Sequence, residues 1–174
     1  MSLLPGSTSI EIVNPAINRG SFGYVLIDFD GTISVIRQGW REIMISMMVD
    51  ILADFKTGET ESDLINLVTG FVDELTGQQT IYQMLRFCEE IRHRDGTPAD
   101  ASIYKQQFHD QLNTHIADRI QGLKSGTLLP EDLMLPGTRD LLENLTNRGL
   151  ELYLASGTDI QYVQIEAELL GVTS

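Results

Sequence analysis

The chain has 174 residues, and 42% of them are hydrophobic, which is enough to build a globular core. Its formal net charge of −13 disfavours a nucleic-acid partner, because neutralising a phosphate backbone requires a basic surface. The single cysteine, Cys88, excludes an intrachain disulfide and fits a reducing compartment. No apolar run reaches the length of a membrane span, so we expect a cytoplasmic protein that acts on a small molecule and has no membrane partner.

The first strong structural signal follows residues 1–21, a segment broken by Pro and Gly that we expect to be an irregular leader. The continuous apolar run of residues 24–27 is typical of a buried parallel strand. Asp28 and Asp30 stand at its carboxyl end, where open α/β sheets bind ligands, and Gly31 then permits a sharp turn. One acid could act as a nucleophile and the other as a proton donor and acceptor. The alternative is that both acids only cap the turn.

Four amphipathic helices with short breaks are predicted within residues 34–130, and such a pattern is typical of a helical bundle. The first helix should end near Gly58. Thr60, with Asp63 three residues later, predicts a capping box at the start of the second helix.

The third and fourth of these helices have equally clear apolar faces. Residues 80–94 should form the third helix, with an inward stripe of Ile81, Leu85, Cys88 and Ile91. The fourth should end at Gly122. His109 and His115 lie on it six residues apart, so they do not share a helical face and a metal pair is not expected.

A second strand is predicted near the end of the chain. Pro136 opens a turn, leucines at helical spacing follow, and Gly149 ends that helix. Residues 150–155 then form an apolar strand that ends in Ser156 and Gly157. A hydroxyl and a glycine amide just before another helix form an anion site, although Ser156 could also serve as a helix N-cap.

Together, these two segments resemble the signatures of the haloacid dehalogenase superfamily. Its phosphatases carry Asp-x-Asp-x-Thr after the first strand, as residues 28–32 do here. Later they have a Pro-Gly turn, a helix, a glycine, a strand and then Thr or Ser, and Ser156 stands at that point. Family dehalogenases lack the second acid, so Asp30 favours phosphoryl chemistry over carbon–halogen cleavage.

The resemblance implies an α/β fold in which a Rossmann-like parallel-sheet core carries an inserted α-helical cap domain. The core would comprise residues 22–33 and 131–174, and the cap would comprise residues 34–130. Hinges between them would lie near residues 32–39 and 126–136. Closure of such a cap excludes water and selects the substrate.

The resemblance also implies a Mg²⁺-dependent hydrolase acting on a small phosphorylated metabolite. Asp28 would attack phosphorus and form an aspartyl-phosphate, while Asp30 would act as general acid and base. Mg²⁺ would bind the Asp28 carboxylate and the Asp30 main-chain carbonyl. The Ser156 hydroxyl and the amides of Gly157 and Thr32 would hold the phosphoryl oxygens.

Substrate selection is harder to assign. Arg37, Trp40 and Arg41 lie just past the first signature, and one of them could contact the substrate. The alternative is a solvated arginine pair and a packing tryptophan. A sugar phosphomutase would use the same acids, so it is the alternative enzyme.

The chain departs from the family pattern after the second signature. The family places a lysine and further metal-binding acids there, whereas no lysine follows Thr158 in this sequence. The core is therefore expected to be incomplete in this chain, as a fragment, a truncated form or a degenerate form. An incomplete sheet would expose an edge and permit self-association. The non-catalytic alternative is a phosphate-binding module that lost these groups.

Overall fold

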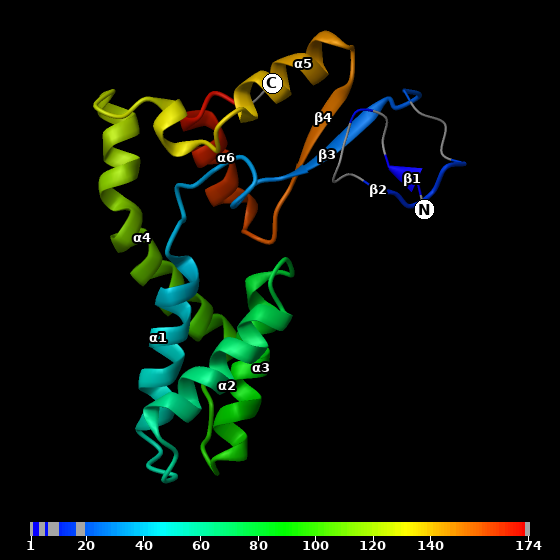
Figure 1. The fold of residues 1–174 in the computed structure, drawn as a ribbon. Coiled ribbons are helices and arrows are strands. Elements are labelled where there is room, and N and C mark those ends of the chain that lie inside the picture. The colour runs from blue at the N-terminus through cyan, green and yellow to red at the C-terminus, as the bar shows by residue number, and fades with distance from the viewer. Residues whose placement is uncertain (1, 4–5, 7–10, 17–19, 173–174) are drawn as a thin grey trace.

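The computed structural model describes residues 2–3, 6, 11–16 and 20–172. Figure 1 shows two regions: a group of helices at one end, and paired strands with further helices at the other. We call residues 40–125 the helical region and residues 20–39 with 126–172 the sheet region. The expected α/β class is therefore confirmed at the level of mixed helices and a small parallel sheet.

The sheet joins the two strands predicted from the apolar runs. β3 (Tyr24–Asp28) pairs in parallel with β4 (Glu151–Ala155), and Asp28 lies opposite Ala155. The prediction that the first strand is buried is wrong, since Tyr24 is 67% exposed and Leu26 is 72% exposed. Successive side chains point to opposite faces of a strand, and only the face of Val25 and Ile27 is partly covered.

The described part of the leader contains a small antiparallel pair rather than only irregular chain. β1 (Ser2–Leu3) pairs with β2 (Glu11–Ile12). The rest of the prediction for the leader falls largely on residues 1, 4–5, 7–10 and 17–19, which lie outside the described residues.

The helical region contains the four helices that the apolar patterns predict. Their bounds are Trp40–Ala53 for α1, Glu61–Glu74 for α2, Thr80–His93 for α3 and Ala101–Ser125 for α4. The predicted capping box is present: the Thr60 hydroxyl accepts from the Asp63 amide, and the Asp63 carboxylate accepts from the Thr60 amide.

Three details of this region differ from the prediction. α1 ends at Ala53, before the predicted end near Gly58. α4 continues past Gly122 to Ser125, and Gly126 with φ of 72° ends it. Gly122 is instead a packing position, because a Cβ there would lie 2.6 Å from the Leu128 side chain. On α3, Leu85 is 48% exposed, while Met84 and Phe87 are fully buried, so the inward face is rotated from the predicted stripe.

The sheet region contains a short 3₁₀ turn and two helices. They are η1 (Pro130–Leu133), α5 (Thr138–Asn147) and α6 (Ile160–Leu169). The two chain segments that join the regions run side by side. The Val35 amide donates to the Leu133 carbonyl at 2.9 Å, and the Leu135 amide donates to the Ile33 carbonyl at 3.0 Å. Both connections therefore cross between the regions at one place.

One apolar cluster extends through both regions. It includes Leu112 and Ile116 of α4, Phe29 within the first signature, and Leu170 at the end of α6. With 25 residues, α4 is about 38 Å long, and it packs against α1 and α3 at one end and α6 at the other. No helix of the described ranges is long and apolar enough to cross a membrane.

Cys88 belongs to this cluster. It is 2% exposed, and burial raises the pKa of its thiol, which fits the packing role expected from the sequence.

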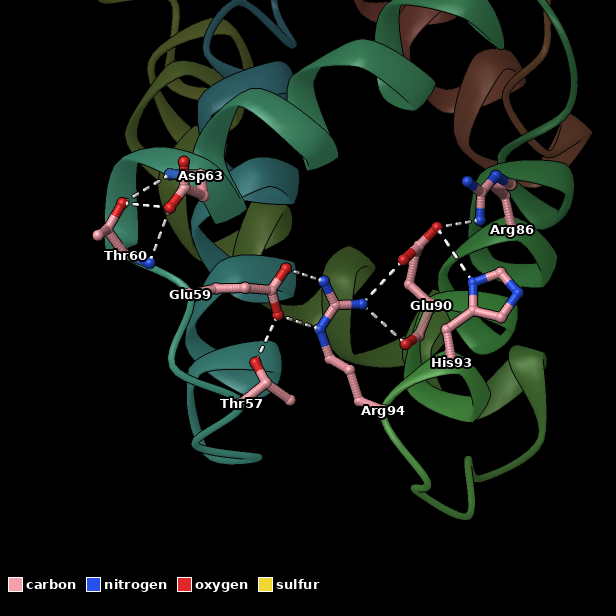
Figure 2. A network of polar contacts seen from close by, with 8 residues as sticks. All are labelled: Thr57, Glu59, Thr60, Asp63, Arg86, Glu90, His93 and Arg94. Atoms are coloured by element: carbon pink, nitrogen blue, oxygen red, sulfur yellow. Dashed lines mark hydrogen bonds and ion pairs between the residues drawn. The ribbon is translucent and has the colours of Figure 1, made fainter.

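The end of the helical region far from the sheet is held by charges (Figure 2). Arg94 donates to Glu59 and to Glu90, with contacts of 2.8 Å to each carboxylate. Arg86 lies 2.5 Å from Glu90 as an ion pair without hydrogen-bond geometry. We call these four residues the distal network.

Candidate functional site

The first signature is anchored by the buried side chain of Phe29, which is completely inaccessible to solvent. The Phe29 carbonyl accepts the amides of Thr32, Ile33 and Ser34, which forms a tight turn. Gly31 enters this turn with φ of 78°, a conformation that side chains disfavour. The apolar anchor and the turn together fix the backbone on which both acids stand.

Asp28 is the more accessible of the two acids. Its Oδ2 accepts a hydrogen bond of 2.9 Å from the Thr32 hydroxyl, which orients the carboxylate. The Thr32 amide donates within the turn, to the Phe29 carbonyl at 3.3 Å, and Thr32 does not line the cavity described below. The structure therefore does not bring the Thr32 amide to the phosphoryl-binding position expected from the sequence.

Asp30 connects the ends of the two strands. Its Oδ2 accepts hydrogen bonds from the Ser156 hydroxyl at 3.2 Å and the Thr158 hydroxyl at 2.8 Å. Its Oδ1 is buried and has no hydrogen-bond partner, and it lies 3.8 Å from Nε of Arg37. An unsatisfied buried oxygen is costly, and the charge of Arg37 at 3.8 Å offsets part of that cost.

Both acids line a cavity of about 190 Å³ between the two regions. The other lining groups used below are Arg37 and Trp40, the Ser156–Thr158 loop, and Thr76–Gln78 with Thr80 from the turn between α2 and α3. A Cβ at Gly157 would lie 2.5 Å from the Gln78 carbonyl oxygen. Only glycine lets the backbone of the helical region approach this loop so closely.

Arg37 is held at the cavity by a buried ion pair with Glu166 of α6. Nε of Arg37 lies 2.9 Å from Oε1 of Glu166 and 3.1 Å from Oε2, and Nη2 lies 2.7 Å from Oε1. Arg37 is 5% exposed and Glu166 is 3% exposed. The Arg37 guanidinium also lies over the Tyr162 ring, at 5.2 Å from its centroid.

Two titratable groups near this pair are shifted by burial. Burial raises the pKa of Glu166, and nearby Asp30 adds to that rise, while Arg37 opposes it. Burial lowers the pKa of His109, which stacks on Tyr162, and the Arg37 charge lowers it further. Neither ring nitrogen of His109 has a hydrogen-bond partner among the described residues.

The three candidate specificity residues are placed differently. Arg37 and Trp40 line the cavity, and Arg37 is buried, so it is not the solvated arginine of the alternative interpretation. Arg41 does not line the cavity. Its guanidinium makes two hydrogen bonds of 2.7 Å to Asp73 on α2.

The charges around the cavity are unequal. Asp28, Asp30 and Glu166 are acidic, and Arg37 is the one cation among the described lining residues. Nowhere in the described ranges do three or more His, Cys, Asp or Glu side chains form a metal cluster. Mg²⁺, however, is commonly held by one or two carboxylates with water and phosphate oxygens. The hard oxygen donors and the excess negative charge therefore fit Mg²⁺ at Asp28 and at the Asp30 carbonyl.

Sequence reasoning missed several groups at this site. Thr158 stands two residues after Ser156 at a strand end, so its position was a readable signal. Glu166 reads only as a residue of an amphipathic helix, and nothing in the sequence pairs it with Arg37. The sequence gives no signal for the Thr76–Gln78 turn either, because its approach to Gly157 is a contact between distant parts of the chain.

Comparison with known proteins adds no assignment. A scan against protein-family models found no match, and a search of curated proteins found none either. The function is therefore inferred from the residues and the geometry of the cavity.

Proposed function

We propose that this chain carries the catalytic site of a Mg²⁺-dependent phosphomonoester hydrolase for a small phosphorylated metabolite. The observation that carries the proposal is the meeting of Asp28, Asp30 and the Ser156 and Thr158 hydroxyls around one cavity. These groups come from the ends of two parallel strands, the usual ligand position in α/β sheets. They also match the order of the two haloacid dehalogenase signatures.

The domain organisation proposed with this function is a Rossmann-like core with an inserted helical cap. The core would comprise residues 22–33 and 131–174, and the cap residues 34–130. Two observations support this division. Both connections cross between the regions side by side, and the turn between α2 and α3 reaches the cavity from the helical region.

The first half of the reaction uses both acids. An Asp28 carboxylate oxygen attacks phosphorus in line, the bond to the ester oxygen breaks, and Asp30 gives its proton to the departing alkoxide. The Thr32 hydroxyl orients Asp28 for this attack. The Ser156 hydroxyl and the Gly157 amide would then hold phosphoryl oxygens.

The second half regenerates the enzyme. Asp30 accepts a proton from water as the water oxygen attacks phosphorus, the bond to Asp28 breaks, and inorganic phosphate leaves. The turn from the helical region limits access of bulk water to the cavity. When bound at Asp28 and the Asp30 carbonyl, Mg²⁺ supplies positive charge that offsets phosphoryl charge in this acidic protein.

Phosphate release from an aryl phosphate, with and without Mg²⁺, tests the proposal directly. We expect metal-dependent release by the unchanged chain and at least a thousandfold loss, as an order of magnitude, in Asp28→Asn. Asp118→Asn is the matched control, because Asp118 is an exposed acid of α4 outside the cavity.

Full activity of Asp28→Asn would refute the nucleophile assignment. Phosphate binding without release by the unchanged chain would favour the non-catalytic phosphate-binding module. Transfer of phosphate to a sugar phosphate, in place of its release, would favour the phosphomutase.

A further inference from the structure

We propose that Arg37 is the oxyanion-binding side chain of the cavity, and that Glu166 is the positioning residue that holds it there. The inference rests on the proposed function for the identity of the ligand, which is a phosphoryl group. Arg37 and Glu166 lie outside both signatures, so the inference adds a binding residue and a positioning residue to the site.

The first argument comes from the donors of Arg37. A guanidinium has five N–H donors, and Glu166 uses those of Nε and one of Nη2. Nη1 makes no hydrogen bond to a described residue. It is not one of the fully buried atoms that lack a partner, so it is at least partly accessible. Donors of Arg37 therefore remain for a ligand in the cavity that this side chain lines. Planar pairs of such donors match phosphate oxygens well.

The second argument comes from the charges. A phosphoryl group in the cavity would meet the carboxylates of Asp28 and Asp30. Arg37 is the one cation among the described residues that line the cavity, and its Nε lies 3.8 Å from Asp30. It is therefore the side chain that can offset the charge of an oxyanion beside these acids.

The third argument concerns Glu166. A buried ion pair contributes little net stability, because removing both charges from water costs about as much as their attraction returns. Its clear effect here is on position. Glu166 fixes the guanidinium plane by contacts with Nε and Nη2, and Tyr162 of the same helix lies against the guanidinium. α6 starts directly after the Ser156–Thr158 loop, so one helix aligns Arg37 with the hydroxyls.

Calorimetric titration with inorganic phosphate in the presence of Mg²⁺ tests the inference without requiring turnover. Arg37→Gln should weaken phosphate binding about tenfold to a hundredfold, the range of a charged hydrogen bond. Arg37→Lys keeps the charge but loses the planar fork, so it should recover part of the affinity. Arg41→Gln is the matched control, because Arg41 makes a similar pair with Asp73 away from the cavity.

The folding risk of Arg37→Gln is an unpaired, buried Glu166. The double variant Arg37→Gln/Glu166→Gln removes both charges together, so neither is left buried without its partner, and it should show the same loss of phosphate binding. Glu166→Gln alone should raise KM for the aryl phosphate more than it lowers kcat, and Glu166→Asp should partly restore KM. A purely structural role would lower Tm and leave KM unchanged.

The outcomes separate the two proposals. If the unchanged chain and the double variant bind phosphate equally, the inference is wrong, while turnover by the unchanged chain would still support the hydrolase. If the unchanged chain binds phosphate through Arg37 but releases none from the ester, the inference stands and the hydrolase is wrong. If the unchanged chain does not bind phosphate, the inference is wrong.

Discussion

Two buried glutamates, one in the distal network and one beside the cavity, meet opposite electrostatic conditions. Glu90 of the distal network is 5% exposed and Glu166 at the cavity is 3% exposed, and each pairs with arginine (Figure 2 shows the distal network). For Glu90, burial would raise the pKa, but Arg94 and Arg86 outweigh it, so the pKa is lowered. For Glu166, burial prevails over Arg37, and the pKa is raised.

The difference lies in how many arginines each glutamate contacts, two for Glu90 and one for Glu166. In the distal network, two arginines face two glutamates, so the charges of the network are balanced. At the cavity, Arg37 serves Glu166 and also faces Asp30, whose Oδ1 has no hydrogen-bond partner. Balanced charges fit a structural role. Surplus negative charge at strand ends fits a site that binds a cation and reacts.

Asp30→Asn should give the largest effect, and it should separate activity from stability. Loss of the proposed proton donor and acceptor should lower the rate of aryl phosphate hydrolysis about a hundredfold to ten-thousandfold. The free energy of unfolding should stay constant or rise by up to ~1 kcal/mol, because a charge near Glu166 is removed. Steady-state kinetics and urea unfolding measure the two effects. A large destabilisation would mean that Asp30 has a structural role like that of Glu90.

Glu90→Gln should show the reverse separation. It removes one of the two carboxylates that pair with Arg94, whose side chain is 7% exposed, and leaves Glu59 as the remaining partner, so unfolding should become easier by about 1.5 to 3 kcal/mol. Hydrolysis measured well below the lowered Tm should be unchanged, since Glu90 does not line the cavity. A loss of activity in the folded variant would contradict this assignment.

The pH dependence of stability should differ in sign between the two glutamates. The raised pKa of Glu166 means that the folded state binds a proton more tightly than the unfolded state does. The resulting stabilisation is present below about pH 4.5 and is lost as the pH rises through the pKa of the folded state. The lowered pKa of Glu90 gives a stabilisation of the folded state that is present above pH 4.5 and is lost as the pH falls through the pKa of the folded state. The free energy of unfolding, measured with urea at several pH values in this range, should change its slope against pH in opposite directions in Glu166→Gln and Glu90→Gln. The same change of slope in both variants would show that the two glutamates do not differ in their electrostatic contribution.

His109→Phe should have the smallest effect. The lowered pKa of His109 means that the folded state favours the neutral ring, so wild-type stability falls as pH drops below 6.5. Phenylalanine keeps an aromatic ring against Tyr162 and removes two unpartnered nitrogens, so the variant should resist this fall. Thermal unfolding of both proteins at neutral pH and at a pH about one unit below 6.5 measures this difference in stability. An identical decline in both proteins would show that His109 does not contribute.

Local sequence patterns predicted much of the chain because local physics decides them. The Thr60–Asp63 capping box, the glycine turns and the strands at residues 24–28 and 151–155 depend on neighbours along the chain. The errors concern positions where side-chain packing decides the conformation. Gly122 continues a helix because Leu128 packs on it, and Leu85 is exposed because α3 is rotated toward Met84.

The candidate site divides in the same way. The sequence by itself determined that two acids stand after one strand and a hydroxyl after another, because a strand end followed by glycine is a short-range pattern. Only the tertiary structure decided that Thr158 joins Asp30, that Glu166 holds Arg37 across 129 positions of sequence, and that Gln78 meets Gly157. Such contacts depend on how helices pack around the sheet, and residue spacing carries no record of that packing.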